Sequence, residues 1–238
     1  MSEFGKLYIV ATPIGNLEDI TLRALKVLRE VDLILCEDTR VAKKLLDRYE
    51  IQKPLLSYHH HSKLSRVEKI VEHLENGKNL ALVSDAGTPG ISDPGNELIA
   101  QLTKAQPSSE RRLSLRIIPI PGASAITCLA SVAGINMSRF TFLGFPPHKK
   151  GRETFFKEVA GAKYPVIYFE SPHRFLKNLE LLEKFRPDAK LVVGRELTKM
   201  FEEIVRGEIR KIREYFQGNS ENQEDRGKVR GEFVIIIH

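Results

Sequence analysis

The most informative stretch for the fold and function of this chain is Leu80-Ala81-Leu82-Val83-Ser84-Asp85-Ala86-Gly87-Thr88-Pro89-Gly90-Ile91-Ser92-Asp93-Pro94-Gly95. In it, an apolar run leads into a turn that is rich in glycine, proline and short oxygen-bearing side chains. The apolar run predicts a buried strand. Glycine tolerates backbone angles closed to other residues and lets a ligand approach the main chain, while proline stiffens the loop before the ligand arrives. Because ligands of parallel α/β sheets bind beyond the carboxyl ends of the strands, we expect a binding loop here.

Two phosphate-binding signatures are absent from the sequence. There is no G-x-x-x-x-G-K-[ST], and Gly87, Gly90 and Gly95 do not make G-x-G-x-x-G. The loop lacks lysine and arginine but carries Asp85 and Asp93. A polyanionic phosphate is therefore a poor fit, and a neutral or cationic ligand is a better one.

Length and composition are those of a globular protein with one large or two small domains. The chain has 238 residues, 42% of them hydrophobic, and no apolar run approaches the length that spans a membrane. The first residues lack a secretory pattern, so we expect a cytoplasmic protein. Cys36 and Cys128 form no spacing motif, and we expect both to be reduced residues of the core.

Charge is distributed unevenly along the chain. Lysine and arginine number 17 against 16 acidic residues over positions 1–120, but 20 against 15 over positions 121–238, within a formal net charge of +6. A basic second half suits contact with a polyanion such as RNA, whose binding is dominated by neutralisation of phosphates. A solvated basic surface with no partner explains the charge alone equally well.

Apolar runs alternate with amphipathic stretches in the first half of the chain. Strands are predicted at 7–11, 33–36, 55–58, 80–83 and 115–118. Apolar residues at helical spacing predict helices over 22–28 and 67–74, the second with Ser65 and Glu68 as a capping box and Gly77 as its stop. This βαβα order predicts a mostly parallel sheet covered by helices.

The pattern pauses at Pro119-Ile120-Pro121-Gly122, which predicts an N-terminal α/β domain over 1–120 and a C-terminal α/β domain over 121–238. A small-residue helix is expected over 123–133, later helices near 153–159, 174–185 and 208–216, and strands at 140–143, 166–170, 191–195, 203–206 and 233–237. Because short turns join some of these elements, the second sheet is expected to be mixed. Two polar stretches, 104–112 and 218–230, are expected to be mobile surface loops.

Six short motifs occur in one order along the chain and together carry a family resemblance. They are Thr12-Pro13-Ile14-Gly15-Asn16-Leu17, Cys36-Glu37-Asp38-Thr39-Arg40, the Ser84 to Gly95 loop quoted above, Pro121-Gly122-Ala123-Ser124-Ala125, Phe142-Leu143-Gly144-Phe145-Pro146-Pro147 and Glu170-Ser171-Pro172-His173-Arg174. With them the chain closely resembles, over nearly its whole length, the bacterial 16S rRNA (cytidine-2′-O)-methyltransferase family, called ribosomal RNA small subunit methyltransferase I, in the tetrapyrrole-methylase superfamily.

The resemblance implies two α/β domains of tetrapyrrole-methylase type, with S-adenosyl-L-methionine in the cleft between them. It also implies methyl transfer to the ribose 2′-hydroxyl of a cytidine in the decoding region of 16S rRNA. The expected partners are 16S rRNA or the small ribosomal subunit, and a second copy of the chain in a homodimer. None of this substrate detail follows from composition or periodicity.

The predicted cofactor-binding residues are Pro13, Asp85, Gly87, Thr88, Pro89, Ser124 and Ala125. S-adenosylmethionine carries a sulfonium cation, which an acidic, glycine-rich loop suits, so Asp85 is the expected polar anchor. The family pattern implies that Ser124 and Ala125 contact the cofactor from the other side. Ser124 also suits the role of a helix cap, and the two roles do not exclude each other.

The chemistry implied by the resemblance is an in-line displacement, so holding the hydroxyl against the methyl carbon and excluding water supply most of the acceleration. The 2′-hydroxyl must also lose its proton, which a carboxylate or imidazole within hydrogen-bond reach could accept. The candidates are Glu170, which is preferred, His173 and Asp38, with Glu37 beside it. Asp38 is explained equally well as a helix cap paired with Arg40, and Ser171-Pro172 as the start of a helix.

The predicted RNA-binding residues are Asn16, Arg40, His148, Lys149, Lys150, Arg152 and Arg174. The best phosphate-binding patch is His148-Lys149-Lys150-Gly151-Arg152, whose cations oppose the dipole of the helix that they precede. A solvated helix terminus is the alternative. For Asn16, a plain turn role is as well supported.

No metal is expected at His59-His60-His61, because adjacent side chains at a strand end point to different sides and no cysteine or carboxylate completes a ligand set. Two alternatives to an RNA methyltransferase stay open: a non-catalytic ribosome-binding or assembly factor that reuses the fold, and a methyltransferase acting on a small tetrapyrrole. Other members of the fold carry a glycine-rich loop after the first strand for their small substrate. The loop over 12–19 departs from that pattern, which favours the RNA-modifying branch.

Overall fold

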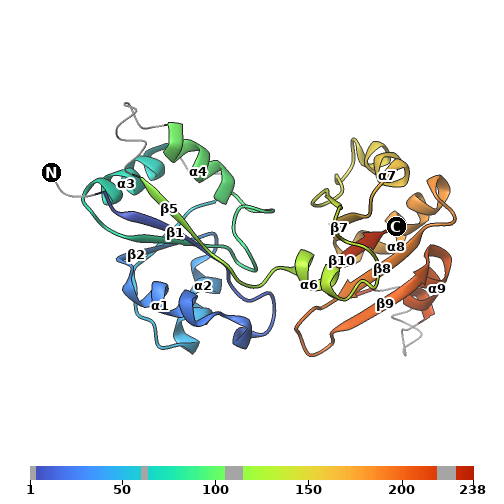
Figure 1. Cartoon of the computed structure of the whole chain (residues 1–238), viewed down its shortest axis with the longest axis horizontal. Helices are drawn as coiled ribbons and strands as arrows, with labels where there is room; N and C mark the ends of the chain where they lie inside the picture. Colours follow the sequence, from blue (N-terminus) through green and yellow to red (C-terminus); the bar gives the residue numbers. More distant parts are fainter. Residues whose placement is uncertain (1–3, 60–63, 105–114, 219–228) are drawn as a thin grey trace. The chain divides into compact units, whose positions relative to one another are not determined.

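The computed structural model describes residues 4–59, 64–104, 115–218 and 229–238. The chain folds as two compact units, Met1–Ser124 and Ala125–His238, and each has its own five-stranded sheet (Figure 1). The last strand of the first sheet ends at Ile120, and the first helix of the second unit begins at Ala125. Residues 121–124 therefore follow the first sheet and lead into the second unit.

The sheet of the first unit is wholly parallel. Its strands are β1 (Lys6–Val10), β2 (Leu33–Cys36), β3 (Leu55–Ser57), β4 (Leu80–Val83) and β5 (Arg116–Ile120). They lie in the order β3-β2-β4-β1-β5. The predicted strands and the parallel sheet are confirmed, with bounds that differ by one or two residues at some ends.

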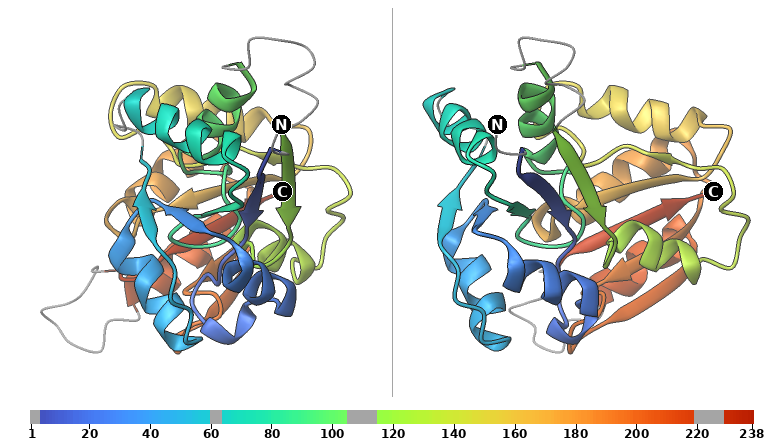
Figure 2. Two further views of the ribbon diagram at one scale, coloured as in Figure 1. Left: turned by 90° about the vertical axis from the view of Figure 1, so that its left-hand side faces the viewer. Right: turned by 60° about the vertical axis from the view of Figure 1, so that its left-hand side comes forward.

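Helices cover both faces of this sheet (Figures 1 and 2), as α1 (Leu22–Glu30) and α2 (Thr39–Arg48) pack on one face and α3 (Leu64–Glu75) and α4 (Gly95–Lys104) on the other. Side chains alternate between the faces, so that Ile34 joins the core beneath α1 and α2 while Leu35 joins the core beneath α3 and α4. Burial on both faces explains why the strands read as continuous apolar runs.

The observed ends of α1 and α3 can be compared with the capping residues expected from the sequence. Thr21 caps α1 by accepting a hydrogen bond of 3.1 Å from the Ala24 N–H. Gly77 has a φ of +75° and donates to the Leu74 carbonyl at 3.0 Å, which confirms it as the stop after α3. The predicted capping box is wrong, because α3 begins at Leu64 and Ser65 already lies inside the helix. Helix α4, which starts directly after the glycine-rich loop, was not predicted.

Strands β1 and β4 are neighbours in the sheet, yet the helices that follow them, α1 and α4, cover opposite faces. Such a reversal is the place where ligands bind in open α/β sheets, outside the carboxyl ends of the strands. The segments that leave the sheet here are the one after Val10 and the one after Val83. The topology therefore directs attention to the loop with which the sequence analysis began.

The second unit has a mixed sheet, as predicted. Its strands are β6 (Thr141–Phe142), β7 (Val166–Glu170), β8 (Lys190–Arg195), β9 (Glu203–Glu208) and β10 (Phe233–Ile237), in the order β6-β7-β10-β8-β9. The pair β6–β7 is parallel and the other pairs are antiparallel.

The helices of the second unit are α6 (Ala125–Ser131), α7 (Arg152–Gly161), α8 (Pro172–Phe185) and α9 (Ile209–Gly218). The last three pack over one face of the sheet around an aromatic core, in which Phe175 stacks on Phe233 with ring centroids 4.2 Å apart. Gly194 lies on β8, and a Cβ there would be 2.9 Å from the Leu129 side chain of α6. Helix α6 therefore packs close against β8, on the side that the glycine leaves open.

Within the described residues, no helix is long and apolar enough to cross a membrane. Cys36 is buried at the end of β2, as predicted, but Cys128 on α6 is only half-buried and is not a core residue. The expected mobile stretches 104–112 and 218–230 fall mainly outside the described residues, as do His60 and His61.

Candidate cofactor and substrate site

The loop after β4 is joined to the loop after β1 at the place where the sheet topology reverses. Thr12 and Gly87 exchange two backbone hydrogen bonds of 3.0 and 3.1 Å. The buried Thr12 hydroxyl donates to the Ser84 carbonyl at 3.1 Å. The Ser84 hydroxyl in turn donates to the Gly87 carbonyl at 3.0 Å. Within the loop over 84–95, the first turn is thus held by hydroxyl groups of the protein itself.

Two further features define this first turn. Gly87 has a φ of +81°, and a Cβ there would lie 3.2 Å from the Ile14 side chain, so a larger residue would be strained and crowded. The Thr88 hydroxyl donates to the Ala123 carbonyl at 3.2 Å. That bond ties the loop to the segment immediately before Ser124 and Ala125, the residues predicted to contact the cofactor. Pro89 is buried in the same turn.

The second half of the loop is held by Asp93, which the sequence analysis had counted as charge available to a ligand. Its carboxylate accepts hydrogen bonds of 2.8 Å from the Gly90 N–H and 2.8 Å from the Gly95 N–H. Asn96 completes this turn by donating from its side-chain amide to the Gly90 carbonyl. Asp93 therefore shapes the loop from within and caps α4, which leaves Asp85 as the exposed acid of the loop.

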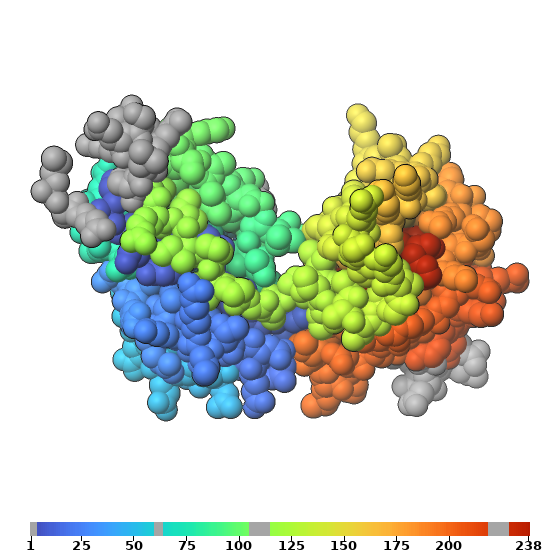
Figure 3. Space-filling view, in the orientation of Figure 1, coloured from blue at the N-terminus to red at the C-terminus, as the bar shows by residue number. Residues whose placement is uncertain are grey.

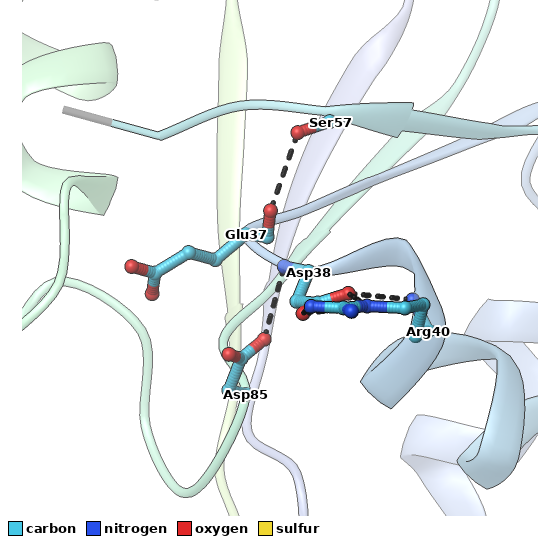
Figure 4. Close-up of polar contacts among 5 residues, drawn as sticks. All are labelled: Glu37, Asp38, Arg40, Ser57 and Asp85. Atoms are coloured by element: carbon cyan, nitrogen blue, oxygen red, sulfur yellow. Dashed lines mark hydrogen bonds and ion pairs between the residues drawn. The ribbon is translucent and has the colours of Figure 1, made fainter. Parts of the chain in front are cut away.

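Asp85 lies among other acids at the carboxyl ends of β2 and β4 (Figure 4). One of its carboxylate oxygens accepts a hydrogen bond of 3.1 Å from the Asp38 N–H, which links the two strand ends. The Ser57 hydroxyl donates to the Glu37 carbonyl at 3.2 Å and brings the end of β3 to the same edge. Burial, with the negative charges of Asp85 and Asp38, raises the pKa of the Cys36 thiol to about 11. A further negative charge at the end of β2 is therefore disfavoured.

Asp38 is the N-cap of α2, as one of the two explanations expected. Its carboxylate accepts a hydrogen bond of 2.8 Å from the Arg40 N–H and forms an ion pair of 2.6 Å with the Arg40 guanidinium. Hydrogen bonds from Arg40 lower the pKa of Asp38 to about 2. A carboxyl group with so low a pKa is a weak proton acceptor, and the Arg40 guanidinium is already bonded to it.

The loop after β1 carries two predicted site residues. Pro13 is buried, one residue beyond the Thr12–Gly87 bridge. Asn16 is exposed and caps the short helix η1 (Leu17–Asp19), where its side chain accepts a hydrogen bond of 3.0 Å from the Glu18 N–H. The turn role weighed for Asn16 is thus present in the structure.

Glu170 lies at the end of β7 in the second unit, and its side chain is fully buried. One carboxylate oxygen accepts a hydrogen bond of 2.7 Å from the Ser171 N–H and lies 3.3 Å from the Arg174 guanidinium. The other oxygen accepts a hydrogen bond from the side-chain amide of Asn178. Burial and the charge of Glu170 raise the pKa of the Tyr168 hydroxyl well above its usual range. Glu170 is therefore a buried, multiply bonded carboxylate.

The sequence analysis missed Asn178. A polar residue in the apolar stripe that α8 turns toward the core, beside Phe175, Leu179 and Leu182, is the signal that could have identified it. The start of α8 was predicted correctly, because Ser171 is the N-cap and Pro172 follows in the first turn. His173, between them and Arg174, has an exposed side chain.

The predicted RNA-binding residues of the second unit lie on and beside the loop between β6 and α7. Arg174 donates to the Pro146 carbonyl at 3.0 Å, and Arg152 donates to the Pro147 carbonyl at 3.3 Å. These two arginines therefore hold the loop as well as carry charge. The remaining three, His148, Lys149 and Lys150, are exposed. In the space-filling view the yellow-green to yellow segment that contains them lies at the surface of the second unit (Figure 3).

The predicted site residues thus gather in two groups. In the first unit the ends of β1, β2 and β4 bring Pro13, Asp38, Asp85, Gly87 and Thr88 to one edge of the sheet. In the second unit Glu170 and Arg174 are in contact, and Arg174 reaches the loop that carries the exposed cations. Among the residues that the structure describes, no group of three or more histidine, cysteine, aspartate or glutamate side chains could hold a metal ion.

Sequence comparison identifies relatives over the full length of the chain. Residues 6–213 match the profile of the Tetrapyrrole (Corrin/Porphyrin) Methylases. Ribosomal RNA small subunit methyltransferase I of Bacillus subtilis (strain 168) is 41% identical over 237 residues, which cover 99% of this chain and 76% of that protein. The protein of the same name from Thermotoga maritima is 40% identical over 98% of both chains.

Structural comparison agrees on the fold. The methyltransferase CobJ superposes with a TM-score of 0.66 at 18% identity, over 98% of this chain and 93% of that one. Uroporphyrin-III C-methyl transferase from Thermus thermophilus, solved in complex with S-adenyl homocysteine, superposes with a TM-score of 0.59 at 16% identity, over 98% and 97%. Taken with the two α/β units and the matched profile, these likenesses establish that the chain belongs to the tetrapyrrole methylase family, in the branch of the ribosomal RNA small subunit methyltransferases I.

Proposed function

We propose that this protein transfers a methyl group from S-adenosyl-L-methionine to the ribose 2′-hydroxyl of a cytidine in the decoding region of 16S rRNA. The observation that carries the proposal is the acidic loop of the first unit, which is held in shape by its own hydrogen bonds and lies beside the end of β2. The relatives named as ribosomal RNA methyltransferases support the substrate class. The assignment of a cytidine 2′-hydroxyl as the methyl acceptor is based on the sequence resemblance.

The residues of this loop fit the cofactor. S-adenosylmethionine supplies an electrophilic methyl group on a sulfonium cation. The exposed Asp85 carboxylate attracts that positive charge, and the loop over 84–95 has no lysine or arginine to oppose it. Gly87 fixes the first turn of the loop, because its φ of +81° and the nearby Ile14 side chain leave no room for a larger residue. Thr88 and Pro89 form the adjoining wall, and Pro13, Ser124 and Ala125 complete the proposed cofactor set.

The same residues favour catalysis by positioning. The hydroxyl bonds of Thr12 and Ser84 and the carboxylate bonds of Asp93 fix the loop before a ligand arrives, so little ordering is left to be done on binding. An in-line displacement gains most of its acceleration from such fixed geometry. The role of Asp85 is to hold the cofactor in one orientation.

The proton of the 2′-hydroxyl needs an acceptor, and the three candidates differ in their surroundings. Asp38 is bonded to Arg40, and its pKa is lowered to about 2. Glu170 is buried and accepts hydrogen bonds from Ser171 and Asn178. His173 has an exposed imidazole, which an RNA ribose can reach. We therefore assign proton acceptance to His173 and a positioning role to Glu170, which fixes the helix start on which His173 lies.

The proposal includes the partners implied by the resemblance. The exposed side chains of His148, Lys149 and Lys150 contact phosphates of 16S rRNA, either free or within the small ribosomal subunit. Arg40, Arg152, Arg174 and Asn16 belong to the same proposed RNA surface. The protein acts as a homodimer in the cytoplasm, and light scattering of the purified protein would measure its mass in solution.

The decisive experiment incubates the protein with methyl-labelled S-adenosylmethionine and small ribosomal subunits that lack ribose methylation. The RNA is then digested, and the labelled nucleoside is identified. Labelled 2′-O-methylcytidine is the expected product. Cofactor binding without incorporation would instead indicate a binding or assembly role, and label in a tetrapyrrole but not in RNA would indicate a small-molecule enzyme.

A further inference from the structure

The loop between β6 and α7 exposes an aromatic side chain beside its cations. Phe145 is 54% exposed, although it lies only one residue before the buried Pro146. Large aromatic side chains bury most of their surface in a folded protein, and an exposed one beside polar groups is typical of a contact surface. The question is which partner this ring meets.

The Phe145 ring is supported from beneath. It packs against Phe169 with ring centroids 5.3 Å apart and a tilt of 56°. Phe169 is held in turn by Phe142, with centroids 5.0 Å apart in an edge-to-face arrangement. One side of the Phe145 ring is therefore backed by protein, while more than half of its surface faces solvent.

The backbone around Phe145 is also fixed. The Gly144 carbonyl accepts a hydrogen bond of 2.9 Å from the Phe169 N–H, and the Pro146 carbonyl accepts one of 3.0 Å from Arg174. Two prolines follow the ring, which restrict the main chain further. A ring presented in this way loses little freedom when it binds a flat partner.

Three basic residues follow these two prolines. His148, Lys149 and Lys150 are exposed, and within the described part of the chain no ion pair engages the two lysines. The hairpin between β8 and β9 provides a contrast, because Phe201 there is 71% exposed but the nearby Lys199 is bonded to Glu196 and Glu232. An exposed ring with unneutralised cations beside it thus occurs at Phe145 and not at Phe201.

We infer that Phe145 is a stacking platform for an unpaired base of the RNA, with His148, Lys149 and Lys150 on the adjoining phosphates. Proteins that bind single-stranded nucleic acid combine aromatic side chains, on which bases stack, with cations that follow the backbone. A paired base in a duplex offers no free face to such a ring. The inference rests on the proposed function and deepens it, because it specifies an RNA segment with splayed-out bases as the substrate class.

The test compares binding of a short single-stranded oligoadenylate with binding of an RNA duplex of equal length. Phe145→Ala is expected to weaken single-strand binding roughly 5- to 150-fold, the usual effect of removing one stacking ring. Phe145→Tyr keeps a flat ring and is expected to restore binding to within about threefold. Phe201→Ala is the matched control, because it removes a ring that is even more exposed from a surface whose lysine is already paired, and it should leave the Kd unchanged.

The salt dependence of RNA binding distinguishes a failure of this inference from a failure of the proposed function. Phe145→Ala should leave the slope of log Kd against log salt unaltered, whereas Lys149→Ala with Lys150→Ala should reduce its magnitude by about 1.4, as expected for two phosphate contacts on a single strand. If the lysine pair has its effect but Phe145→Ala does not weaken single-strand binding, stacking is refuted and RNA binding stands. If Phe145→Ala weakens duplex binding equally, the single-strand preference is refuted. If no variant changes binding and no methyl group is incorporated, the proposed function itself fails.

Discussion

Replacement of Glu170 by alanine should destabilise the second unit more than any surface change of equal size. The side chain of Glu170 is 0% exposed and that of Arg174 is 14% exposed, so solvent screens their interaction little. Its removal leaves the Ser171 N–H, the Asn178 amide and the Arg174 guanidinium without their shared acceptor. Breaking a buried pair in this way costs about 3–5 kcal/mol.

The magnitude should depend on what replaces the carboxylate. Glu170→Gln keeps one acceptor oxygen but loses the charge, so we expect a smaller cost of about 1–3 kcal/mol. The matched control is Glu153→Ala. The Glu153 side chain is 64% exposed and pairs with Lys157 on the surface of α7, so solvent screens the contact and its loss should change stability little.

Hydrogen exchange measured by mass spectrometry provides a readout that separates the two units. Amides of β7 should exchange roughly 150- to 5,000-fold faster in Glu170→Ala, the equivalent of the expected loss of free energy. Amides of β1 in the first unit serve as the internal reference and should not change. Unchanged exchange in β7 together with abolished methyl transfer would refute the reasoning, because Glu170 would then act in the chemistry and not through the fold.

Three further predictions concern the first unit. The pKa of Asp38 is lowered from 3.8 to about 2 in the folded state, so its contribution to stability is complete above pH 4 and is lost as the pH falls toward 2; acid unfolding of Asp38→Asn should lack that part of the pH dependence. Asp85→Asn should weaken cofactor binding in calorimetry about 10- to 150-fold without lowering the melting temperature, whereas the control Asp47→Asn, on the exposed face of α2, should not affect it, and equal affinities of the two variants would defeat the anchor assignment. Gly87→Ala places a Cβ 3.2 Å from Ile14 at a φ of +81° and should lower stability by about 1–2 kcal/mol in urea unfolding, so an unaltered midpoint would show that the turn relaxes without strain.

The sequence was most predictive where burial on two faces left a continuous apolar run. Strands β2, β4 and β10 were placed at their observed bounds for this reason. Helix α4 was missed because it begins at Gly95, the last residue of the glycine-rich loop, and the sequence analysis considered Asp93 only as a charge of that loop and not as an acceptor for the first N–H of a helix. The capping box at Ser65 was wrong because α3 already includes Leu64, and a four-residue motif does not by itself fix the first residue of a helix.

For the candidate site, the sequence indicated which residues follow the strand ends but not how their side chains are bonded. The order of elements and the loop chemistry indicated correctly that Asp85 lies at a strand end. The burial of Glu170 depends on Asn178 eight residues later and on the loop at Pro146, contacts that arise only when β7, α8 and that loop pack together. The spacing of residues along a chain does not reveal such packing, so the sequence could not show that Glu170 is buried and bonded to Asn178.

The three contacts of Arg174 limit how this surface could be re-engineered. Its guanidinium donates to the Ser171 hydroxyl at 2.9 Å and the Pro146 carbonyl at 3.0 Å, and it lies 3.3 Å from the Glu170 carboxylate. A planar fork can serve three acceptors at once, whereas a lysine offers a single nitrogen. Grafting residues 142–152 onto a foreign scaffold would therefore transplant the aromatic ring without its anchorage, unless the start of α8 and the end of β7 were transplanted with it.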